Sequence, residues 1–168
     1  MTTTSSPMWI VIADDHTMVR RSLRSLLDAE PGCEVVAEAG DAGMVSRLVQ
    51  DHSPHVLVLD LHMGSRSSLG LISELRRQAP GTAIVGVTME RSPSFAARVF
   101  DLGAAGFVQK DRADAELVRA VRRAARGVRY TSPCVAPALE RLRRPGMSGL
   151  PRLRARPGRT AERPLSAS

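Results

Sequence analysis

Five polar side chains each follow an apolar segment of the sequence: Asp14, Asp15, Asp60, Thr88 and Lys110. Three carboxylates packed together would repel one another and raise each other's pKa unless a cation lay among them. Mg²⁺ is the expected cation because it is a hard ion that takes oxygen ligands. Lys110, the only lysine of the chain, and Thr88 would then hold an anion at the opposite rim.

Asp60 is the candidate nucleophile. An aspartate is anionic at neutral pH and needs no general base, so it can attack phosphorus once a cation screens both charges. The sequence contains no GxSxG motif that would indicate a serine nucleophile. Taken alone, Asp60 could equally be a helix cap or turn residue. The combined pattern favours phosphoryl transfer to a carboxylate.

Apolar segments alternate with amphipathic ones, which is typical of a parallel sheet covered by helices on both faces. We expect five strands, over Met8–Ala13, Glu34–Glu38, Val56–Asp60, Ala83–Val87 and Gly106–Gln109. We expect helices around Val19–Leu27 and over Ala42–Asp51, Ser68–Ala79, Ser94–Leu102, Asp111–Arg126 and Cys134–Arg143. In strand order 2-1-3-4-5, the five polar side chains meet at one sheet edge. The predicted fold is α/β, with a doubly wound five-stranded parallel sheet.

Four segments carry a family resemblance: IVIADDH, VLVLDLHM, VGVTM and AAGFVQKD. In this order, over residues 8–128, they resemble the flavodoxin-like receiver domain of bacterial two-component response regulators. The segments TMER and GVRYTSPCVA further resemble the NarL/FixJ-type (LuxR-type) subfamily of transcription regulators. The resemblance implies a signalling switch with at most self-phosphorylation and self-dephosphorylation, and so no enzyme in the usual sense.

The resemblance also implies the site residues. Asp60 would accept a phosphoryl group from a histidine kinase. Four groups would bind Mg²⁺: the carboxylates of Asp14, Asp15 and Asp60, and the backbone carbonyl of His62. The resemblance thus agrees with the magnesium site expected from the clustered carboxylates.

Five further residues would form the switch and its rim. Thr88 and Lys110 would contact the phosphoryl group, and Phe107 would turn inward when Thr88 moves. Met89 and Glu90 would lie at the rim, where the family tunes the lifetime of the phosphorylated state. The movement would reshape the face formed by the fourth helix, fifth strand and fifth helix, as a partner surface or in a homodimer.

Charge divides the chain into two unlike parts. Residues 1–118 contain 11 basic and 15 acidic residues, whereas residues 119–168 contain 13 arginines and 2 glutamates. We expect a receiver domain at 8–128, a linker with a short helix at 129–144, and a basic, disordered tail at 145–168. The tail leaves open an alternative function, in which it binds nucleic acid without sequence preference.

The NarL/FixJ-type subfamily usually continues into a helix-turn-helix domain. Here residues 153–158 read LRARPG where that domain would open, and only ten residues follow. We therefore do not expect sequence-specific DNA binding from this chain alone. A prematurely ended or frame-shifted regulator would give such a sequence, because out-of-frame GC-rich DNA encodes much Arg, Pro, Ala and Gly.

Other classes of protein are disfavoured. No apolar run approaches the roughly 18 residues of a membrane span, and the first residues do not resemble an export signal, so we expect a cytoplasmic protein. Cys33 and Cys134 are far apart and lack CxxC neighbours, so neither a disulfide framework nor a zinc site is expected. A phosphohydrolase with an aspartyl-phosphate intermediate would need a second acid two residues after Asp60, where His62 stands.

Overall fold

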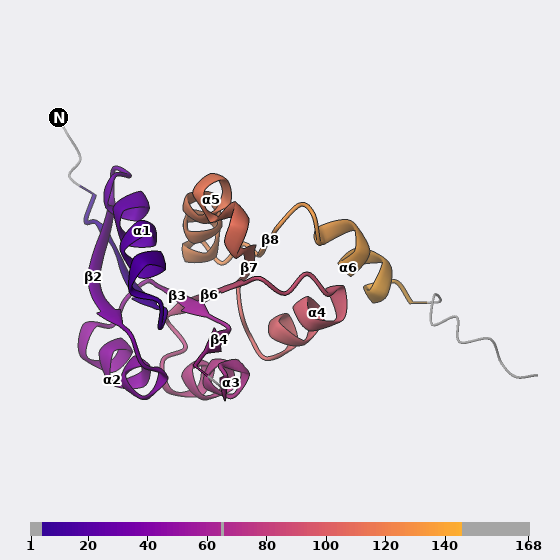
Figure 1. Cartoon of the computed structure of the whole chain (residues 1–168), viewed down its shortest axis with the longest axis horizontal. Coiled ribbons are helices and arrows are strands. Elements are labelled where there is room, and N and C mark those ends of the chain that lie inside the picture. The colour runs from indigo at the N-terminus through magenta and orange to yellow at the C-terminus, as the bar shows by residue number, and fades with distance from the viewer. Residues whose placement is uncertain (1–4, 65, 146–168) are drawn as a thin grey trace, which may run out of the picture.

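A parallel sheet covered by helices on both faces forms the centre of the molecule (Figure 1). The computed structural model describes residues 5–64 and 66–145. In spatial order the strands are β2 (Cys33–Ala39), β1 (Met8–Ala13), β3 (Val56–Asp60), β6 (Ala83–Thr88), β7 (Gly106–Gln109) and β8 (Tyr130–Thr131). All of these strands pair in parallel. The α/β class and the order of the five predicted strands are confirmed.

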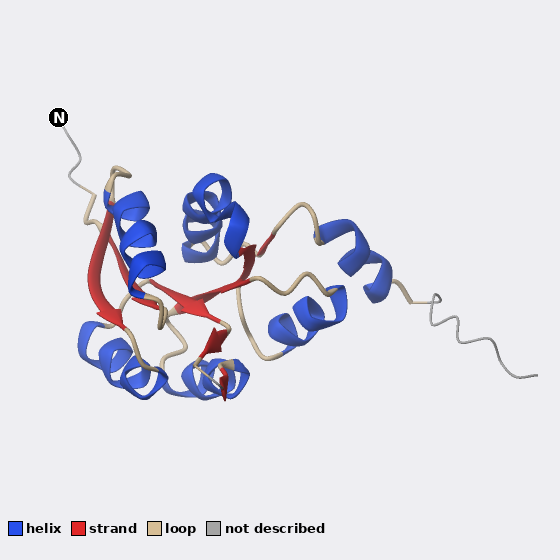
Figure 2. Ribbon diagram, in the orientation of Figure 1, coloured by secondary structure: helices blue, strands red, loops and turns tan. Residues whose placement is uncertain are grey.

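Helices cover both faces of the sheet (Figure 2). One face carries α1 (Thr17–Asp28) and α5 (Ala113–Ala125), with the short 3₁₀ helix η1 (Lys110–Arg112) before α5. The opposite face carries α2 (Ala42–His52), α3 (Leu69–Gln78) and α4 (Pro93–Asp101). Successive strand residues point to opposite faces, so Ile10 and Ile12 join the α1/α5 core while Val11 and Leu57 join the other.

The prediction of a five-stranded sheet was wrong, because β8 adds a sixth strand at the edge. A strand of two residues has too little periodicity to be recognised in a sequence. After β8, the helix α6 (Ala136–Arg143) packs against α4, and Val135 and Leu139 are buried in the core on that face. The boundary expected at residue 128 stays a prediction, but packed structure continues beyond it.

The loop after β3 contains a second, antiparallel pair of short strands that was not predicted. It consists of β4 (His62–Met63) and β5 (Arg66–Ser67). The expected disordered tail, its possible nucleic-acid binding and the missing helix-turn-helix concern sequence that lies, apart from Pro145, outside the described residues. Among the described helices, none has the length and apolar character needed to cross a membrane.

Candidate functional site

The carboxyl ends of four adjacent strands bring the predicted site residues to one edge of the sheet. The strand register aligns Ala13 with Leu59, Asp60 with Val87, and Thr88 with Gln109. An open cleft of about 540 Å³ lies at this edge. It is lined by His16, Asp60, His62, Met89, Glu90, Arg91 and Lys110. Met89 and Glu90 thus line the cleft beside Asp60, and their predicted role at the rim stays a prediction.

Asp60 and Asp14 share one cation. The ammonium nitrogen of Lys110 lies 2.9 Å from Oδ2 of Asp14 and 3.1 Å from Oδ2 of Asp60. Both carboxylates are buried, and Oδ1 of Asp60 accepts a hydrogen bond of 3.0 Å from the backbone N–H of His62. Burial raises the pKa of Asp60, and these two contacts offset only part of the rise. Burial by itself would lower the pKa of Lys110. The hydrogen bonds and negative charges of Asp14 and Asp60 have the larger effect, so the pKa of Lys110 is raised and its ammonium group stays charged.

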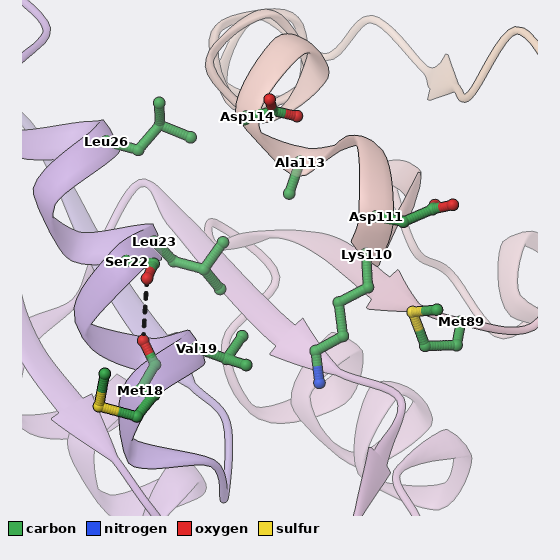
Figure 3. Close-up of a pocket in the computed structure, with 10 residues that line it drawn as sticks. All are labelled: Met18, Val19, Ser22, Leu23, Leu26, Met89, Lys110, Asp111, Ala113 and Asp114. Atoms are coloured by element: carbon green, nitrogen blue, oxygen red, sulfur yellow. Dashed lines mark hydrogen bonds between the residues drawn. The ribbon is translucent and has the colours of Figure 1, made fainter.

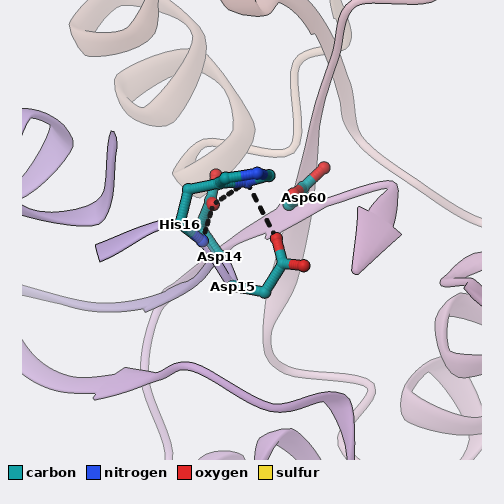
Figure 4. Close-up of side chains that lie close together, drawn as sticks. All are labelled: Asp14, Asp15, His16 and Asp60. Atoms are coloured by element: carbon teal, nitrogen blue, oxygen red, sulfur yellow. Dashed lines mark hydrogen bonds and ion pairs between the residues drawn. The ribbon is translucent and has the colours of Figure 1, made fainter. Parts of the chain in front are cut away.

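Asp15 is held from the loop after β3. Its Oδ2 accepts a hydrogen bond of 2.6 Å from the backbone N–H of Gly64, which lowers the pKa of Asp15. Gly64 has a φ of +65°, a conformation that glycine adopts without strain. The ring nitrogen Nδ1 of His16 lies 3.0 Å from Oδ1 of Asp15 and 3.5 Å from Oδ1 of Asp14 (Figure 4). The loop and the start of α1 therefore fix the second carboxylate beside the first.

The donor set fits a divalent cation. Ligand atoms of Asp14, Asp15, His16 and Asp60 all lie within 4.8 Å of one another. Oδ2 of Asp14 is buried and contacts Lys110, and Oδ1 of Asp15 is buried and contacts the His16 ring; neither oxygen has a further hydrogen-bond partner in the described part of the chain. Carboxylate oxygens of this kind suit Mg²⁺. His16 was not predicted as part of the site, although its place directly after the two aspartates could have indicated it.

Thr88 lies at the end of β6 and is nearly fully buried. Its hydroxyl oxygen accepts a hydrogen bond of 3.0 Å from the backbone N–H of Glu90 and lies 3.5 Å from Nδ1 of His62. The ring of His62 stacks on Phe95 of α4, with ring centroids 5.6 Å apart. The Thr88 side of the site is thus in contact with α4 through aromatic rings.

Phe107 lies deeper, on β7, and is fully buried. Its ring contacts Phe95 and Phe100 of α4, with centroid distances of 6.2 and 6.5 Å. Phe107 therefore already lies inward in this structure, against the helix that the predicted switch would move.

An apolar groove between α1 and α5 opens beside the site (Figure 3). Its lining includes Val19, Leu23 and Leu26 of α1, and it shares Met89 and Lys110 with the cleft. Met18 at its edge is 73% exposed. The groove therefore offers an accessible apolar surface that is continuous with the charged site.

Comparisons with known proteins identify the family. The response regulator receiver domain family matches residues 10–122. The chain is 36% identical to the nitrate/nitrite response regulator protein NarP of Escherichia coli (strain K12) over 128 residues, which cover 76% of this chain and 60% of NarP. The chain thus spans about 60% of the length of the curated relatives first matched.

Solved structures agree with this match. A two-component response regulator of the LuxR family from Aurantimonas sp. SI85-9A1 is 35% identical, with a TM-score of 0.77, over 82% of this chain and 99% of that one. The isolated receiver domain of RcsB from Salmonella enterica serovar Typhimurium, solved in the presence of the phosphomimetic BeF₃⁻, is 29% identical, with a TM-score of 0.72, over 80% of this chain and 99% of that one. The chain belongs to the response regulator receiver domain family of two-component signalling, and within it to the NarL/LuxR type.

Proposed function

We propose that this protein is a phosphorylation-dependent switch in which Asp60 accepts a phosphoryl group from a histidine kinase. The observation that carries the proposal is the geometry at Asp60. Its carboxylate ends a buried strand, opens into the cleft, and lies within 3.1 Å of the Lys110 ammonium and beside the carboxylates of Asp14 and Asp15. The RcsB receiver domain, which is similar in fold, was solved with a phosphomimetic, and this supports the proposal.

The chain's own groups account for the transfer. An oxygen of Asp60 attacks phosphorus, a new O–P bond forms, and the P–N bond to the donor imidazole breaks with its electron pair remaining on nitrogen. Asp14, Asp15 and Asp60 would hold Mg²⁺, with the backbone carbonyl of His62 as the further predicted ligand. When bound, Mg²⁺ supplies positive charge that screens the attacking carboxylate from the phosphoryl oxygens. Lys110 neutralises charge at the opposite side of the phosphoryl group.

The contacts of Thr88 suggest how phosphorylation of Asp60 would change the surface of the protein. In the phosphorylated state Thr88 would donate its hydroxyl proton to a phosphoryl oxygen. A shift of Thr88 would reach α4 through His62 and Phe95, and Phe107 would repack between β7 and α4. The face of α4, β7 and α5 would change shape, which biases binding of a partner or a second copy of the chain.

The groove between α1 and α5 is the proposed surface for the phosphodonor. It shares Met89 and Lys110 with the cleft, so a protein bound there would have its phosphohistidine next to Asp60. Its apolar lining and the exposed Met18 fit an apolar helix of the kinase. Docking in the groove would therefore place the donor without covering α4.

Intact mass measured after incubation with acetyl phosphate tests the proposal. With Mg²⁺, the wild-type protein is expected to gain one phosphoryl group. Asp60→Asn and a sample with EDTA are expected to gain none. Asp51→Asn, at an exposed acid on α2, serves as the matched control and is expected to behave as wild type. A folded wild-type protein without an adduct, or an adduct that survives Asp60→Asn, would overturn the assignment.

A further inference from the structure

A buried chain of hydrogen bonds connects the segment after α5 to Thr88. The hydroxyl of Ser132, just after β8, donates to a carboxylate oxygen of Glu116 on α5. The same hydroxyl oxygen accepts a hydrogen bond of 2.9 Å from the backbone N–H of Gln109, at the end of β7. Ser132 and Gln109 are both fully buried. The edge strand β8 is thus joined to its neighbour β7 by a side-chain hydrogen bond just after β8 as well as by backbone pairing.

Gln109 continues this chain toward the site. Its side-chain amide Nε2 donates a hydrogen bond of 2.6 Å to the backbone carbonyl of Glu90. The backbone N–H of Glu90 in turn donates 3.0 Å to the hydroxyl oxygen of Thr88. The bond from Gln109 restrains the backbone of Glu90, whose N–H donates to Thr88. Since Thr88 accepts this bond through its oxygen, its hydroxyl proton can be donated to another acceptor.

Of the two polar atoms of the Gln109 side chain, only the amide nitrogen forms a hydrogen bond among the described residues. Its carbonyl oxygen Oε1 is buried and has no hydrogen-bond partner among the described residues. A buried acceptor without a partner costs free energy, and an apolar side chain of similar length, such as methionine, would avoid that cost. A position chosen only for packing would therefore not favour glutamine.

We propose that Gln109 is a positioning residue for phosphorylation of Asp60: it orients Thr88 through Glu90, and Ser132 of the β8 segment fixes Gln109. The inference rests on the proposed phosphoacceptor function. It also assigns the segment after α5 a role in the reaction, because Ser132 belongs to that segment. Phosphoryl binding at Asp60 and the position of the β8 segment would then depend on each other.

Gln109→Met in the full chain tests the proposal. The variant is expected to unfold at about the same urea concentration as wild type, since the loss of the hydrogen bond to Glu90 is offset by the removal of a buried unpartnered oxygen. Its maximal rate of phosphorylation by acetyl phosphate with Mg²⁺ is nevertheless expected to fall about tenfold, the equivalent of one hydrogen bond. The half-saturating acetyl phosphate concentration stays unchanged, because Gln109 does not reach the cleft.

Two controls separate positioning from a general effect. Gln50→Met removes an exposed amide that bonds Gln78 across α2 and α3, and it is expected to keep the wild-type rate. Ser132→Ala is expected to lower the rate, and Ser132→Thr, which keeps the hydroxyl, to restore much of it. In a double-mutant cycle, Gln109→Met is expected to have no further effect once Thr88 is alanine.

An unchanged rate in Gln109→Met, or an equal loss in the Thr88→Ala background, would overturn the proposal. A second measurement does not depend on phosphorylation. In the unphosphorylated protein, both Gln109→Met and Thr88→Ala are expected to shift the NMR signal of the Glu90 amide, and its constancy would also refute the coupling. A wild type that gains no phosphoryl group would overturn the proposed function, and this amide signal would then decide the coupling alone.

Discussion

Two buried polar clusters lie side by side at the end of β7, and they differ in how their charges are balanced. The acid cluster, defined as Asp14, Asp15, Asp60 and Lys110, contains three carboxylates and one ammonium group, which pairs with Asp14 and Asp60, and it opens into the cleft. The Ser132 cluster, defined as Gln109, Glu116, Tyr130 and Ser132, contains one carboxylate and is buried throughout.

The difference in charge balance indicates that the acid cluster, and not the Ser132 cluster, favours binding of a cation. The acid cluster has three carboxylates and one ammonium group, so it carries more negative charge than Lys110 neutralises. In the Ser132 cluster, the carboxylate of Glu116 accepts from Ser132, whose hydroxyl also accepts from Gln109. An excess of negative charge attracts a cation. The single carboxylate of the Ser132 cluster is instead satisfied within the protein, and the unpartnered atom of that cluster among the described residues is the neutral Oε1 of Gln109.

Lys110→Met is the change with the largest expected effect on stability. Without Mg²⁺, the free energy of unfolding near pH 7 is expected to fall by about 3 kcal/mol, because two buried carboxylates lose their cation. The raised pKa of Lys110 means that this stabilisation is present below its ordinary pKa and is lost as the pH rises through the raised value. Urea unfolding with and without Mg²⁺ measures it, and Mg²⁺ is expected to restore part of the loss.

Arg47→Met is the matched control, since Arg47 forms only an exposed ion pair with Asp51 on α2. Its expected cost is below about 1 kcal/mol. If Mg²⁺ failed to reduce the loss in Lys110→Met, the excess of negative charge in the acid cluster would not be the reason for that loss.

Glu116→Gln tests the Ser132 cluster in the same way. The expected loss is about 2 kcal/mol, because a buried hydrogen bond to a charged acceptor is replaced by a neutral one. Mg²⁺ is expected to leave this loss unchanged, in contrast to Lys110→Met. Glu140→Gln, at an exposed position of α6, is expected to have almost no effect in the same urea experiment. If Mg²⁺ restored the stability lost in Glu116→Gln, the Ser132 cluster and the acid cluster would be energetically coupled and not separate.

Tyr130 gives the smallest and most local measurement. Burial, together with the charge of Glu116, raises the pKa of this phenol above its ordinary value of 10. Because the folded state favours the neutral phenol, its contribution to stability is present below pH 10 and is lost as the pH rises through the raised pKa.

Tyr130 is the only tyrosine of the chain, so absorbance at 295 nm reports its ionisation alone. The midpoint is expected above that of the urea-unfolded protein, and Glu116→Gln is expected to move it downward. If Glu116→Gln left the ionisation midpoint of Tyr130 unchanged, Tyr130 would not interact with the Ser132 cluster.

Much of the fold follows from local patterns in the sequence. The uninterrupted run Val56–Leu59 predicts a strand that is covered on both faces, and β3 is fully buried at the centre of the sheet. Pro93 after Ser92 predicts the start of a helix, and α4 begins there with Ser92 as its cap. The carboxyl-terminal ends of β6 and α5 differ from the predictions by one residue and the start of α5 by two, because helix and strand ends depend on a few hydrogen bonds.

The sequence by itself determined the order of the strands' polar ends, and therefore which side chains could meet at the site edge: Asp14, Asp15, Asp60, Thr88 and Lys110 follow strands that parallel pairing must align. Only the tertiary structure decided that His16 lies against Asp14 and Asp15, that β8 adds a strand to the sheet, and that Gln109 reaches Glu90. The physical reason is the distance along the chain over which each kind of interaction acts. Periodicity and turn residues act over a few neighbours, whereas a hydrogen bond between Gln109 and Glu90 depends on how two strands and a loop pack in space.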